Sequence, residues 1–465
     1  MNGSKRIVIV GGGITGLIAA LFLQKLSLAD TNLDITVLEQ SDQIGGKLKT
    51  IRQDGFTIER GADSFLARKK PGIKLMEELG LVDELIYNET GQAYVYSRGG
   101  LHAIPAGSYM GIPVANEPFI NSELLSEAGK QRVLEEVSIP KGSMDDDQSL
   151  GTFLRRRFGD ELVENMLEPL LSGIYSSDID DMGLLSTFPR FHELEQEYGS
   201  VLRGLRATMP TQAANTGKKP GQFVSLNGGL GRMVDTLVDA IGPDIIHTEK
   251  DVQRIARSHR GYELSTADGS RYEADRVLLA VPHRKVTSLF ENVSWLNMLD
   301  DIPVSSVVNV VMGFDAGAVE RHLDGTGFVV SRNSDLRITA CTWVDRKWPH
   351  MTPDGKVLLR VYAGKPNDQA IVTLPNDEVI SIVLADLRHI MTIDSEPDFA
   401  VVSRWEKQMP QYTTGHSKMV STARTAIQEN VPGIYLAGSS YDGVGIPDCI
   451  GSAESAVEQI RLSLS

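Results

Sequence analysis

The first motif able to do chemistry is a glycine-rich turn near the N-terminus. In RIVIVGGGITGLIAALFLQKL, glycines stand at positions 11, 13 and 16 between a short apolar strand and an apolar helix. Gly11 allows a tight bend, Gly13 lets the backbone approach a pyrophosphate, and Gly16 lets the helix pack closely on the strand. The N–H groups that open such a helix bind phosphate. We therefore predict a dinucleotide site formed by Gly11, Gly12, Gly13, Ile14, Thr15 and Gly16.

An acidic residue and a second glycine turn follow. The predicted strand LDITVLEQ ends at Glu39, twenty-three residues after Gly16, where a carboxylate can accept hydrogen bonds from both hydroxyls of an adenosine ribose. Next comes SDQIGGKLKT, in which Gly46 and Lys47 form a close-approach turn that carries a cation. A plain nicotinamide domain has no need for this turn, whereas a flavoprotein that wraps FAD along its full length does. We therefore predict FAD as the cofactor, with Glu39, Gln40, Gly46 and Lys47 in its site.

A third glycine-rich stretch stands almost at the end of the chain. GIYLAGSSYDGVGIPDCIGSAESAV combines a short apolar strand with a turn that opens a helix of small residues. FAD is too long for one helix N-terminus, so the first turn is predicted to hold the pyrophosphate and this one to face the pyrimidine edge of the flavin. The positive end of the helix would stabilise the negative charge of reduced flavin. The residues predicted to contact the cofactor here are Gly438, Gly445, Ile446, Pro447 and Asp448.

Motifs for other kinds of chemistry are missing from the sequence. It has no Gly-x-Ser-x-Gly elbow, no Walker loop, no His-Glu-x-x-His motif and no aspartate-rich metal loop, and its nine histidines are scattered. We therefore predict no metal site. We expect the bound cofactor to carry the redox chemistry while protein groups orient the substrate. The sequence names no acid or base residue.

Composition restricts the class of protein further. Of the 465 residues 41% are hydrophobic and 23% charged, as in ordinary globular proteins, and the net charge of −15 would repel nucleic acid and anionic lipid. The two cysteines, Cys341 and Cys449, lie far apart without CxxC spacing, which disfavours a disulfide framework and fits a reducing cytoplasm. Glycines interrupt the apolar run that follows Lys5 and Arg6, so no secretory signal is expected. No apolar run reaches the roughly 18 residues of a transmembrane helix. We predict a cytoplasmic protein without stable membrane insertion.

The order of the predicted elements indicates an α/β protein of three domains. We expect a Rossmann-like FAD-binding domain whose parallel sheet is discontinuous in sequence, a substrate-binding domain with a mixed antiparallel sheet, and a helical insert domain. The FAD-binding domain is predicted to comprise residues 1–65, 221–285 and 425–465. The substrate-binding domain takes residues 66–95, 205–220 and 286–424, and the insert takes residues 96–204. The polar stretch TQAANTGKKPGQ, residues 211–222, is predicted to be a loop between domains.

The phosphate loop paired with Glu-x(5)-Gly-Gly-Lys resembles the signature of the flavin amine oxidase superfamily. In that family the next element, here GFTIERGADSF, brings backbone alongside the flavin ring. The residues implied are Gly61, Ala62, Asp63 and Ser64. The resemblance also implies that Val252 covers the adenine, and a core valine is equally compatible with the sequence there. Many relatives have an acid after the Y-L-A-G strand, whereas this chain has Ser439, so no direct carboxylate contact is expected at that point.

Longer segments resemble the porphyrinogen oxidases, specifically their soluble Gram-positive-type branch. The similarity runs essentially end to end and includes ERGADSFLARKK, DDQSLGTFLRRRFGDELVENMLEPLLSGIY, GTGFVVSRNSD, ITACTWVDRKWPH, RWEKQMPQYTTGH and DGVGIPDCI. It implies an enzyme that uses FAD and molecular oxygen to convert a porphyrinogen into a porphyrin. Six hydrogens leave over three flavin cycles, each by hydride transfer to flavin N5, and hydrogen peroxide is released. The implied substrate is coproporphyrinogen III in heme biosynthesis, with protoporphyrinogen IX as the alternative.

The same resemblance suggests residues that contact the substrate and the ring. A porphyrinogen is a large apolar macrocycle with anionic propionates, so its site should be an apolar cleft with cations at the rim. Lys69 is the leading candidate for a propionate partner, against an exposed helix-start lysine. Trp405 matches a flavin-proximal position of the family, against a core-packing role. Transient contact with other heme-pathway enzymes is also expected.

Two other functions stay open at this point. One is a related amine oxidase or carotenoid desaturase, which amine turnover without porphyrin fluorescence would reveal. The other is a binding module on the same fold without flavin catalysis, as in the prenyl-protein escort proteins. The complete set of Glu39, the second glycine turn and the C-terminal loop argues against the latter.

Overall fold

The structure is a computed structural model that describes residues 4–29, 32–143, 147–209, 221–291, 293–320 and 322–464. The chain divides into two compact units. Unit 1 comprises Met1–Tyr87, Gln222–Ile302 and Ser417–Ser465, and unit 2 comprises Asn88–Gly221 and Pro303–His416. The loop predicted at 211–222 falls mostly outside the described residues. The finer division into substrate-binding and insert domains stays a prediction.

Unit 1 is built on a five-stranded parallel sheet in the order β12-β2-β1-β16-β24. Its strands are β1 (Lys5–Val10), β2 (Leu33–Leu38), β12 (Ile246–His247), β16 (Arg276–Leu279) and β24 (Ile434–Leu436). The central strands read as unbroken apolar runs, as expected of parallel strands that are covered on both faces. Because β1 and β24 each run directly into a glycine turn, both turns follow the carboxyl ends of strands, where α/β sheets bind ligands.

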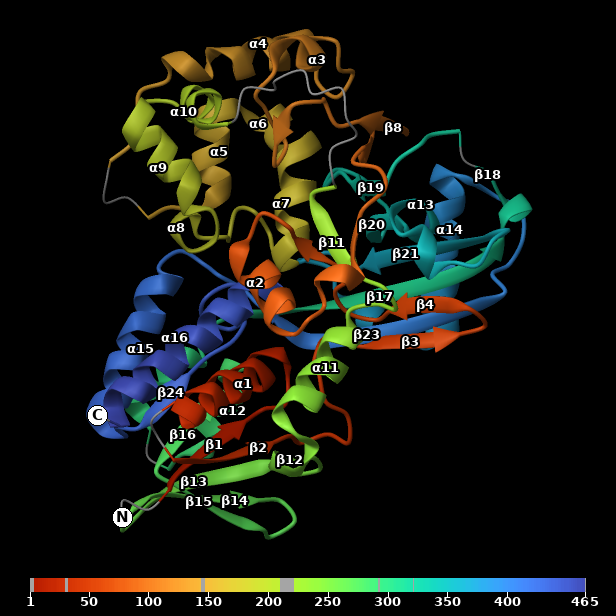
Figure 1. Ribbon diagram of the computed structural model, residues 1–465. Coiled ribbons are helices and arrows are strands. Elements are labelled where there is room, and N and C mark those ends of the chain that lie inside the picture. The colour runs from red at the N-terminus through yellow and green to blue at the C-terminus, as the bar shows by residue number, and fades with distance from the viewer. Residues whose placement is uncertain are drawn as a thin grey trace. The chain divides into compact units, whose positions relative to one another are not determined.

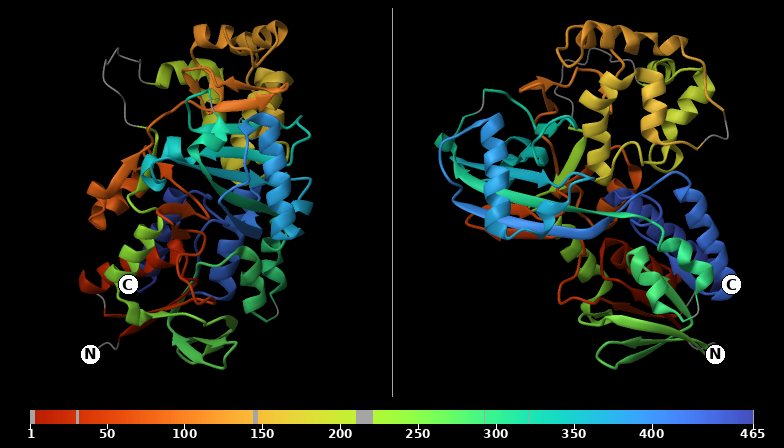
Figure 2. Two further views of the ribbon diagram at one scale, coloured as in Figure 1. Left: turned by 90° about the vertical axis from the view of Figure 1, so that its right-hand side faces the viewer. Right: turned by 180° about the vertical axis from the view of Figure 1, so that it is seen from behind.

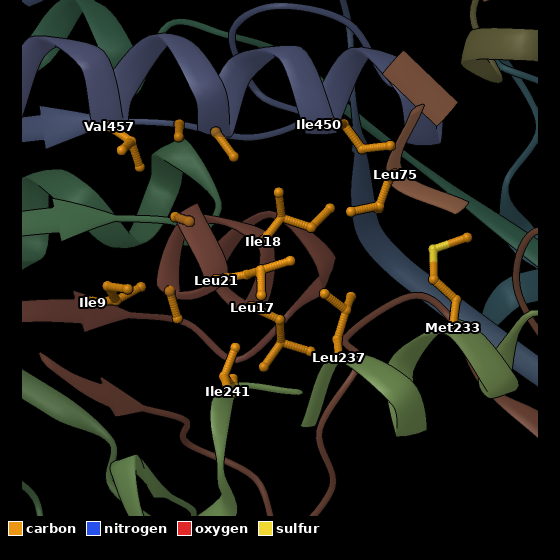
Figure 3. Close-up of a cluster of buried hydrophobic side chains, with 14 of the residues drawn as sticks. Ile9, Leu17, Ile18, Leu21, Leu75, Met233, Leu237, Ile241, Ile450 and Val457 are labelled. Carbon is orange, nitrogen blue, oxygen red and sulfur yellow. The ribbon is translucent and has the colours of Figure 1, made fainter. Parts of the chain in front are cut away.

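Helices cover one face of this sheet. The helices α1 (Ile14–Ala29), α11 (Gly231–Ile241) and α16 (Ile446–Leu464) pack there, with α1 and α16 side by side (Figure 1). Figure 3 shows Leu17, Ile18 and Leu21 of α1 surrounded by apolar side chains of the other elements. The members of this cluster labelled there are Ile9, Leu75, Met233, Leu237, Ile241, Ile450 and Val457. The cluster fixes the depth and direction of α1, and so the position of the glycine turn that precedes it.

The opposite face of the sheet carries a different set of elements. Val8 and Val10 point to it, while Ile7 and Ile9 point toward the helices, in the two-residue period of a strand. The covering elements are the antiparallel meander β13 (Val252–Ser258), β14 (Gly261–Thr266) and β15 (Arg271–Ala274), with α12 (His283–Val286) and α15 (His416–Asn430). The 3₁₀ turns of unit 1 are Val82–Glu84, Pro243–Ile245, Thr287–Leu289 and Ser294–Leu299.

Small sheets complete unit 1. The hairpin β3 (Thr50–Gln53) and β4 (Phe56–Glu59) leads into β5 (Phe65–Leu66), which joins β11 (Phe223–Leu226) and β6 (Leu85–Tyr87) in a three-stranded sheet. Helix α2 (Lys70–Glu78) follows β5 directly. Strand β11, which follows residue 221, pairs with β5 and β6, which both precede residue 88. This pairing joins the two segments within unit 1.

Unit 2 contains a seven-stranded mixed sheet in the order β23-β17-β21-β20-β19-β7-β8. Its strands are β7 (Tyr94–Ser97), β8 (Gly100–Ala103), β17 (Val304–Asp315), β19 (Gly327–Val330), β20 (Ile338–Trp343), β21 (Lys356–Ala363) and β23 (Phe399–Pro410). All neighbours are antiparallel except β19 and β7, which are parallel. Helix α14 (Asn376–Ile390) lies across one face of the sheet (Figure 2) and buries Val379, Val383 and Leu387 against it.

Eight helices from the described part of the first segment of unit 2 form a second group (Figure 1). They are α3 (Asn116–Ile120), α4 (Glu127–Leu134), α5 (Leu150–Phe158), α6 (Asp160–Leu162), α7 (Glu168–Tyr175), α8 (Leu184–Thr187), α9 (Pro189–Tyr198) and α10 (Val201–Thr208). A buried ion pair joins them: Arg157 Nε donates to Glu136 Oε1 at 2.7 Å, and Arg157 Nη1 donates to Glu195 at 3.2 Å. The Arg157 guanidinium is 0% exposed, so these carboxylates, and not solvent, balance its charge.

Shorter elements of unit 2 are the strand pairs β9 (Ser108–Tyr109) with β10 (Ile112–Pro113) and β18 (Val319–Glu320) with β22 (Thr392–Ile393). The others are α13 (Val344–Lys347), the π-helix Val163–Leu167 and 3₁₀ turns at Glu135–Ser138, Ala316–Ala318, Pro349–Met351 and Ala370–Thr373. Among the described residues, no helix is long and apolar enough to cross a bilayer. The predicted fold class is confirmed: a discontinuous parallel-sheet unit accompanies a mixed antiparallel sheet and a group of helices.

Candidate cofactor site

The first glycine turn joins β1 to α1 and leaves no room for side chains at three of its glycines. A Cβ added to Gly12 would lie 2.9 Å from the Cβ of Glu39. Gly11 has φ +111°, and a Cβ added to it would lie 2.6 Å from the carbonyl oxygen of Ala280. A Cβ on Gly16 would lie only 1.9 Å from the Gly11 carbonyl oxygen. The Gly11 N–H donates to Leu38 at 2.8 Å, which ties the turn to β2. Gly11 and Gly16 therefore have the packing roles that the sequence predicted.

Gly13, by contrast, faces open space. A Cβ there would meet only the Cα of Gly46, at 3.8 Å, so the packing of the protein does not itself demand a glycine at this position. The Gly46 turn lies directly behind, because Gly45 N–H donates to Gly12 at 2.9 Å and Gly46 has φ +60°. The first N–H groups of α1 have no intrahelical acceptor. Open backbone beside free helix-opening donors fits a pyrophosphate.

Glu39, the predicted partner of the ribose, is hydrogen-bonded to the first glycine turn. Its Oε2 accepts from Gly12 N–H at 2.7 Å, and its Oε1 accepts from the N–H and hydroxyl of Ser41 at 3.0 and 2.9 Å. An ionised carboxylate offers about four acceptor sites, and the single hydroxyl hydrogen of Ser41 is also within reach of the Gln43 carbonyl oxygen, at 2.6 Å. Glu39 is therefore fixed in orientation and retains acceptor sites for ribose hydroxyls, and its ribose contact stays a prediction. Gln40 is exposed beside it.

The C-terminal loop reaches the same helix opening. Gly438 has φ +119° and lies against α1, since a Cβ on it would stand 3.6 Å from Thr15 Oγ1. Its N–H donates to Ser452 Oγ at 2.9 Å, which anchors the loop to α16. Helix α16 begins at Ile446 with Pro447 in its first turn, and Asp448 N–H donates back to Gly445 at 3.0 Å. The first and third glycine stretches thus meet within unit 1.

Four ionisable side chains lie at the opening of α16. Burial lowers the pKa of Lys47, and burial raises the pKa of the neighbouring Cys449 thiol to about 11, so this cysteine stays protonated near neutral pH. Lys69 precedes α2 and donates to both carboxylate oxygens of Asp448, at 2.6 and 2.7 Å. The predicted propionate partner is therefore already ion-paired, and it keeps one of its three N–H donors for another acceptor.

Polar residues that the sequence did not single out hold the C-terminal loop. Arg424 donates to both oxygens of Asp442 at 2.8 and 2.7 Å, and Ser452 donates to the same carboxylate. Many relatives have an acid at the position of Ser439. In this chain an acid, Asp442, comes three residues later, and its carboxylate accepts from Arg424 and Ser452. Its position inside the glycine turn YDGVG was the signal that could have identified it.

A buried histidine ties the same loop to the chain beyond β16. His283 is 1% exposed and its two ring nitrogens lie 3.1 Å from Ser440 Oγ and 3.1 Å from the carbonyl oxygen of Ile302. A neutral ring that donates to the carbonyl and accepts from the hydroxyl satisfies both contacts. Burial lowers the pKa of His283, which keeps the ring neutral and the loop anchored.

Glu59 is another buried side chain that anchors a turn of unit 1, in this case the turn before α11. This carboxylate is 3% exposed and accepts from Leu230 N–H at 2.6 Å and from Thr50 Oγ1 at 2.7 Å. It therefore fixes the turn that opens α11. The four residues after it that were predicted beside the flavin ring, 61–64, form a half-buried loop in which Ser64 Oγ donates to Asp63 at 2.8 Å.

Two predicted cofactor contacts belong to elements other than the glycine turns. Val252 opens β13, and its side chain is 2% exposed in the cluster that also contains Val10 and Leu38, so it packs as a core valine. Trp405 belongs to unit 2, half-buried in β23 opposite Val307 of β17. Their roles toward a cofactor stay predictions. Within the described part of the chain, no group of three or more His, Cys, Asp or Glu side chains could hold a metal ion.

Comparison with known families identifies the class of protein that this fold and site belong to. The chain belongs to the family described as flavin-containing amine oxidoreductase, whose model matches residues 14–461. It is therefore an enzyme of oxidation–reduction chemistry with a flavin cofactor, as the sequence predicted.

Individual relatives show which members of this family the chain is similar to. The chain is 43% identical to the coproporphyrinogen III oxidase of Bacillus subtilis, over 98% of each protein, and 37% identical to that of Staphylococcus aureus, over 99% of this chain and 100% of the relative. Among solved structures, it is similar to a protein from Exiguobacterium sp. 255-15 that carries a provisional protoporphyrinogen oxidase name. That match has a TM-score of 0.89, 40% identity and 99% coverage of both chains. The predicted resemblance to the porphyrinogen oxidases is confirmed.

Proposed function

We propose that the protein is an FAD-dependent oxidase that converts coproporphyrinogen III into coproporphyrin III in heme biosynthesis, with molecular oxygen as the electron acceptor. The observation that carries the proposal is the pair of helix openings in unit 1, with open backbone at Gly13, in a chain 43% identical over its length to a coproporphyrinogen III oxidase. A second glycine turn behind Gly13 supports FAD over a shorter cofactor.

Each part of unit 1 has a task in this proposal. The opening of α1 binds the pyrophosphate, Glu39 accepts from the ribose, and the opening of α16 stabilises negative charge at the ring. When bound, the flavin supplies a hydride acceptor at N5, and oxygen regenerates it with release of hydrogen peroxide. Removal of six hydrogens takes three such cycles, with three molecules of oxygen consumed and three of peroxide formed. Each cycle would release one proton to solvent; of the three protons, two come from pyrrole N–H groups and one from a meso carbon, so no nucleophile is required.

Lys69 remains the proposed partner of a substrate propionate, in a modified form. Asp448 occupies two of its N–H donors, so one donor would bind the propionate while the ammonium keeps its place. The attraction to an anionic substrate is then weaker than that of an isolated lysine, because the neighbouring carboxylate offsets its charge.

Steady-state oxidation by the purified protein tests this proposal. Coproporphyrinogen III and protoporphyrinogen IX are supplied separately with oxygen, and porphyrin fluorescence and peroxide are measured together. We expect a higher kcat/KM for coproporphyrinogen III. A clear preference for protoporphyrinogen IX would overturn the substrate assignment and would fit the protoporphyrinogen oxidase name of the Exiguobacterium protein. Amine oxidation without porphyrin formation would overturn the reaction class.

We also propose a cytoplasmic location and transient contact with other enzymes of heme synthesis. Coproporphyrin is an intermediate that a metal-inserting or modifying enzyme must consume, so a handover of product is chemically reasonable. Crosslinking in a cell extract, with and without coproporphyrin, would detect such a contact. Fractionation that recovers the protein only with membranes would contradict the location.

A further inference from the structure

The ion pair between Lys69 and Asp448 joins two helices at their positive ends. Lys69 stands immediately before α2, and Asp448 lies in the first turn of α16, 379 residues later in the chain. The ammonium contacts both carboxylate oxygens, at 2.6 and 2.7 Å. The two side chains are 40% and 28% exposed, so neither is lost in the interior.

Packing between the helix ends holds this pair in place. A Cβ added to Gly72, in the first turn of α2, would lie 3.4 Å from the ring of Pro447 and 2.7 Å from that of Phe65. The α2 backbone therefore approaches α16 closely, which brings Lys69 beside Asp448. The pair is thus built by the fold and does not depend on two flexible side chains meeting in solvent.

The carboxylate of Asp448 is folded back over the turn that opens α16. A Cβ on Gly443 would lie 2.6 Å from the Cβ of Asp448, and one on Gly445 would lie 2.8 Å from its Oδ2. The negative charge therefore stands directly beside the helix N-terminus. A helix N-terminus carries about half a positive charge, so an unpaired carboxylate there would cancel the potential that favours reduced flavin.

Lys69 restores that potential. With its ammonium on the carboxylate, the pair is neutral, and the partial positive charges of the two helix ends remain available to an anion. We propose that Lys69 and Asp448 form a charge-balanced pair that sets the reduction potential of the flavin in front of α16. The inference rests on the proposed function, because it requires a flavin at this helix opening. Both residues are positioning residues for charge, and neither touches the reacting atoms.

If the pair sets the reduction potential, removing either charge alone should shift that potential in opposite directions. A purely structural contact would not produce such opposite shifts. Lys69→Met leaves an uncompensated carboxylate and should move the flavin midpoint potential to more negative values. Asp448→Asn leaves an uncompensated ammonium and should move it to more positive values. The double variant removes both charges, so its potential should return close to that of the wild type.

The experiment measures the midpoint potential of the flavin-loaded protein by anaerobic equilibration with redox dyes. The matched control is Lys74→Met, because Lys74 of α2 pairs with Glu454 of the same helix α16 at 3.6 Å, farther along both helices and 63% exposed. We expect the control to keep the wild-type potential. Opposite shifts in the two single variants, with recovery in the double variant, support the inference.

Three results would overturn it. Shifts of the same sign in both single variants would indicate general damage to the helix ends. Potentials that all match the Lys74→Met control, with only a higher KM in Lys69→Met, would assign Lys69 to substrate binding alone. A wild-type protein that carries no flavin spectrum would overturn the proposed function and this inference with it, whereas the first two results leave the proposed function intact.

Discussion

The close packing of Gly16 against Gly11 in the candidate cofactor site can be tested by substitution. In Gly16→Ala, the new methyl carbon would start 1.9 Å from the Gly11 carbonyl oxygen and 3.3 Å from Ile9 Cγ2. Non-bonded atoms settle near 3.5 Å, so α1 must withdraw from the turn by about 1.5 Å. The helix cannot do so freely, because its apolar face is packed in the cluster of Figure 3.

The energetic consequence has two opposing parts. Overpacking a filled site costs about 1–3 kcal/mol or more, while alanine in a helix gains about 0.5–1 kcal/mol over glycine. We expect a net loss of about 1 kcal/mol, which lowers the Tm by about 3 °C. Since the same movement displaces the phosphate-binding N–H groups, flavin affinity should fall at least about tenfold, or about 1.4 kcal/mol.

The assay combines calorimetry with equilibrium binding of FAD to the apoprotein. Gly451→Ala is the matched control, because Gly451 also lies in a helix, α16, and a Cβ there would meet nothing within 4 Å. The control should be neutral or slightly stabilising and bind FAD as the wild type does. If Gly16→Ala matched this control in both Tm and FAD affinity, the close packing of turn and helix would be refuted.

Three further substitutions test other parts of the structure. Arg157→Leu leaves Glu136 buried without its cation and should destabilise unit 2 by about 3–5 kcal/mol in calorimetry. The control Arg190→Leu breaks an exposed pair and should cost less than about 1 kcal/mol. Equal losses in the two variants would contradict the role of the buried pair. Burial raises the pKa of Glu168 to about 7, so its contribution to stability is present below pH 4.5 and is lost as pH rises through 7. Glu168→Gln should therefore gain up to about 3 kcal/mol near pH 8, at about 1.4 kcal/mol per pH unit, and little near pH 4.5; a Tm difference independent of pH would count against it. Glu39→Ala removes the acceptor of Gly12 N–H and should weaken FAD binding about tenfold or more in equilibrium dialysis, and unchanged affinity would exclude the proposed ribose contact.

Local spacing predicted the glycine turns well, because β1 passes directly into α1 and Gly16 there packs against Gly11, five residues earlier. The contact of Gly11 with Ala280 comes from a distant segment, and local spacing did not predict it. The class of fold was predictable for a similar reason, since apolar strands and helices in alternation favour a covered parallel sheet.

Contacts between distant segments were beyond this reasoning. The family resemblance suggested Lys69 as a propionate partner but did not indicate its ion pair, because the partner Asp448 lies 379 residues away and meets it only through the packing of α2 on α16. Asp442 was passed over because an acid was expected directly after the strand, whereas the loop brings the carboxylate to Ser452 from three residues later. Such pairings depend on loop paths that single-residue propensities do not encode.

The central claim, that a flavin held by unit 1 oxidises coproporphyrinogen III, has one most direct test. The purified yellow protein is mixed with coproporphyrinogen III without oxygen, and the flavin absorbance is followed before and after air is admitted. We predict that the flavin colour bleaches on mixing and returns with air, together with coproporphyrin fluorescence and peroxide. A flavin that stays oxidised in the presence of coproporphyrinogen III would contradict the account.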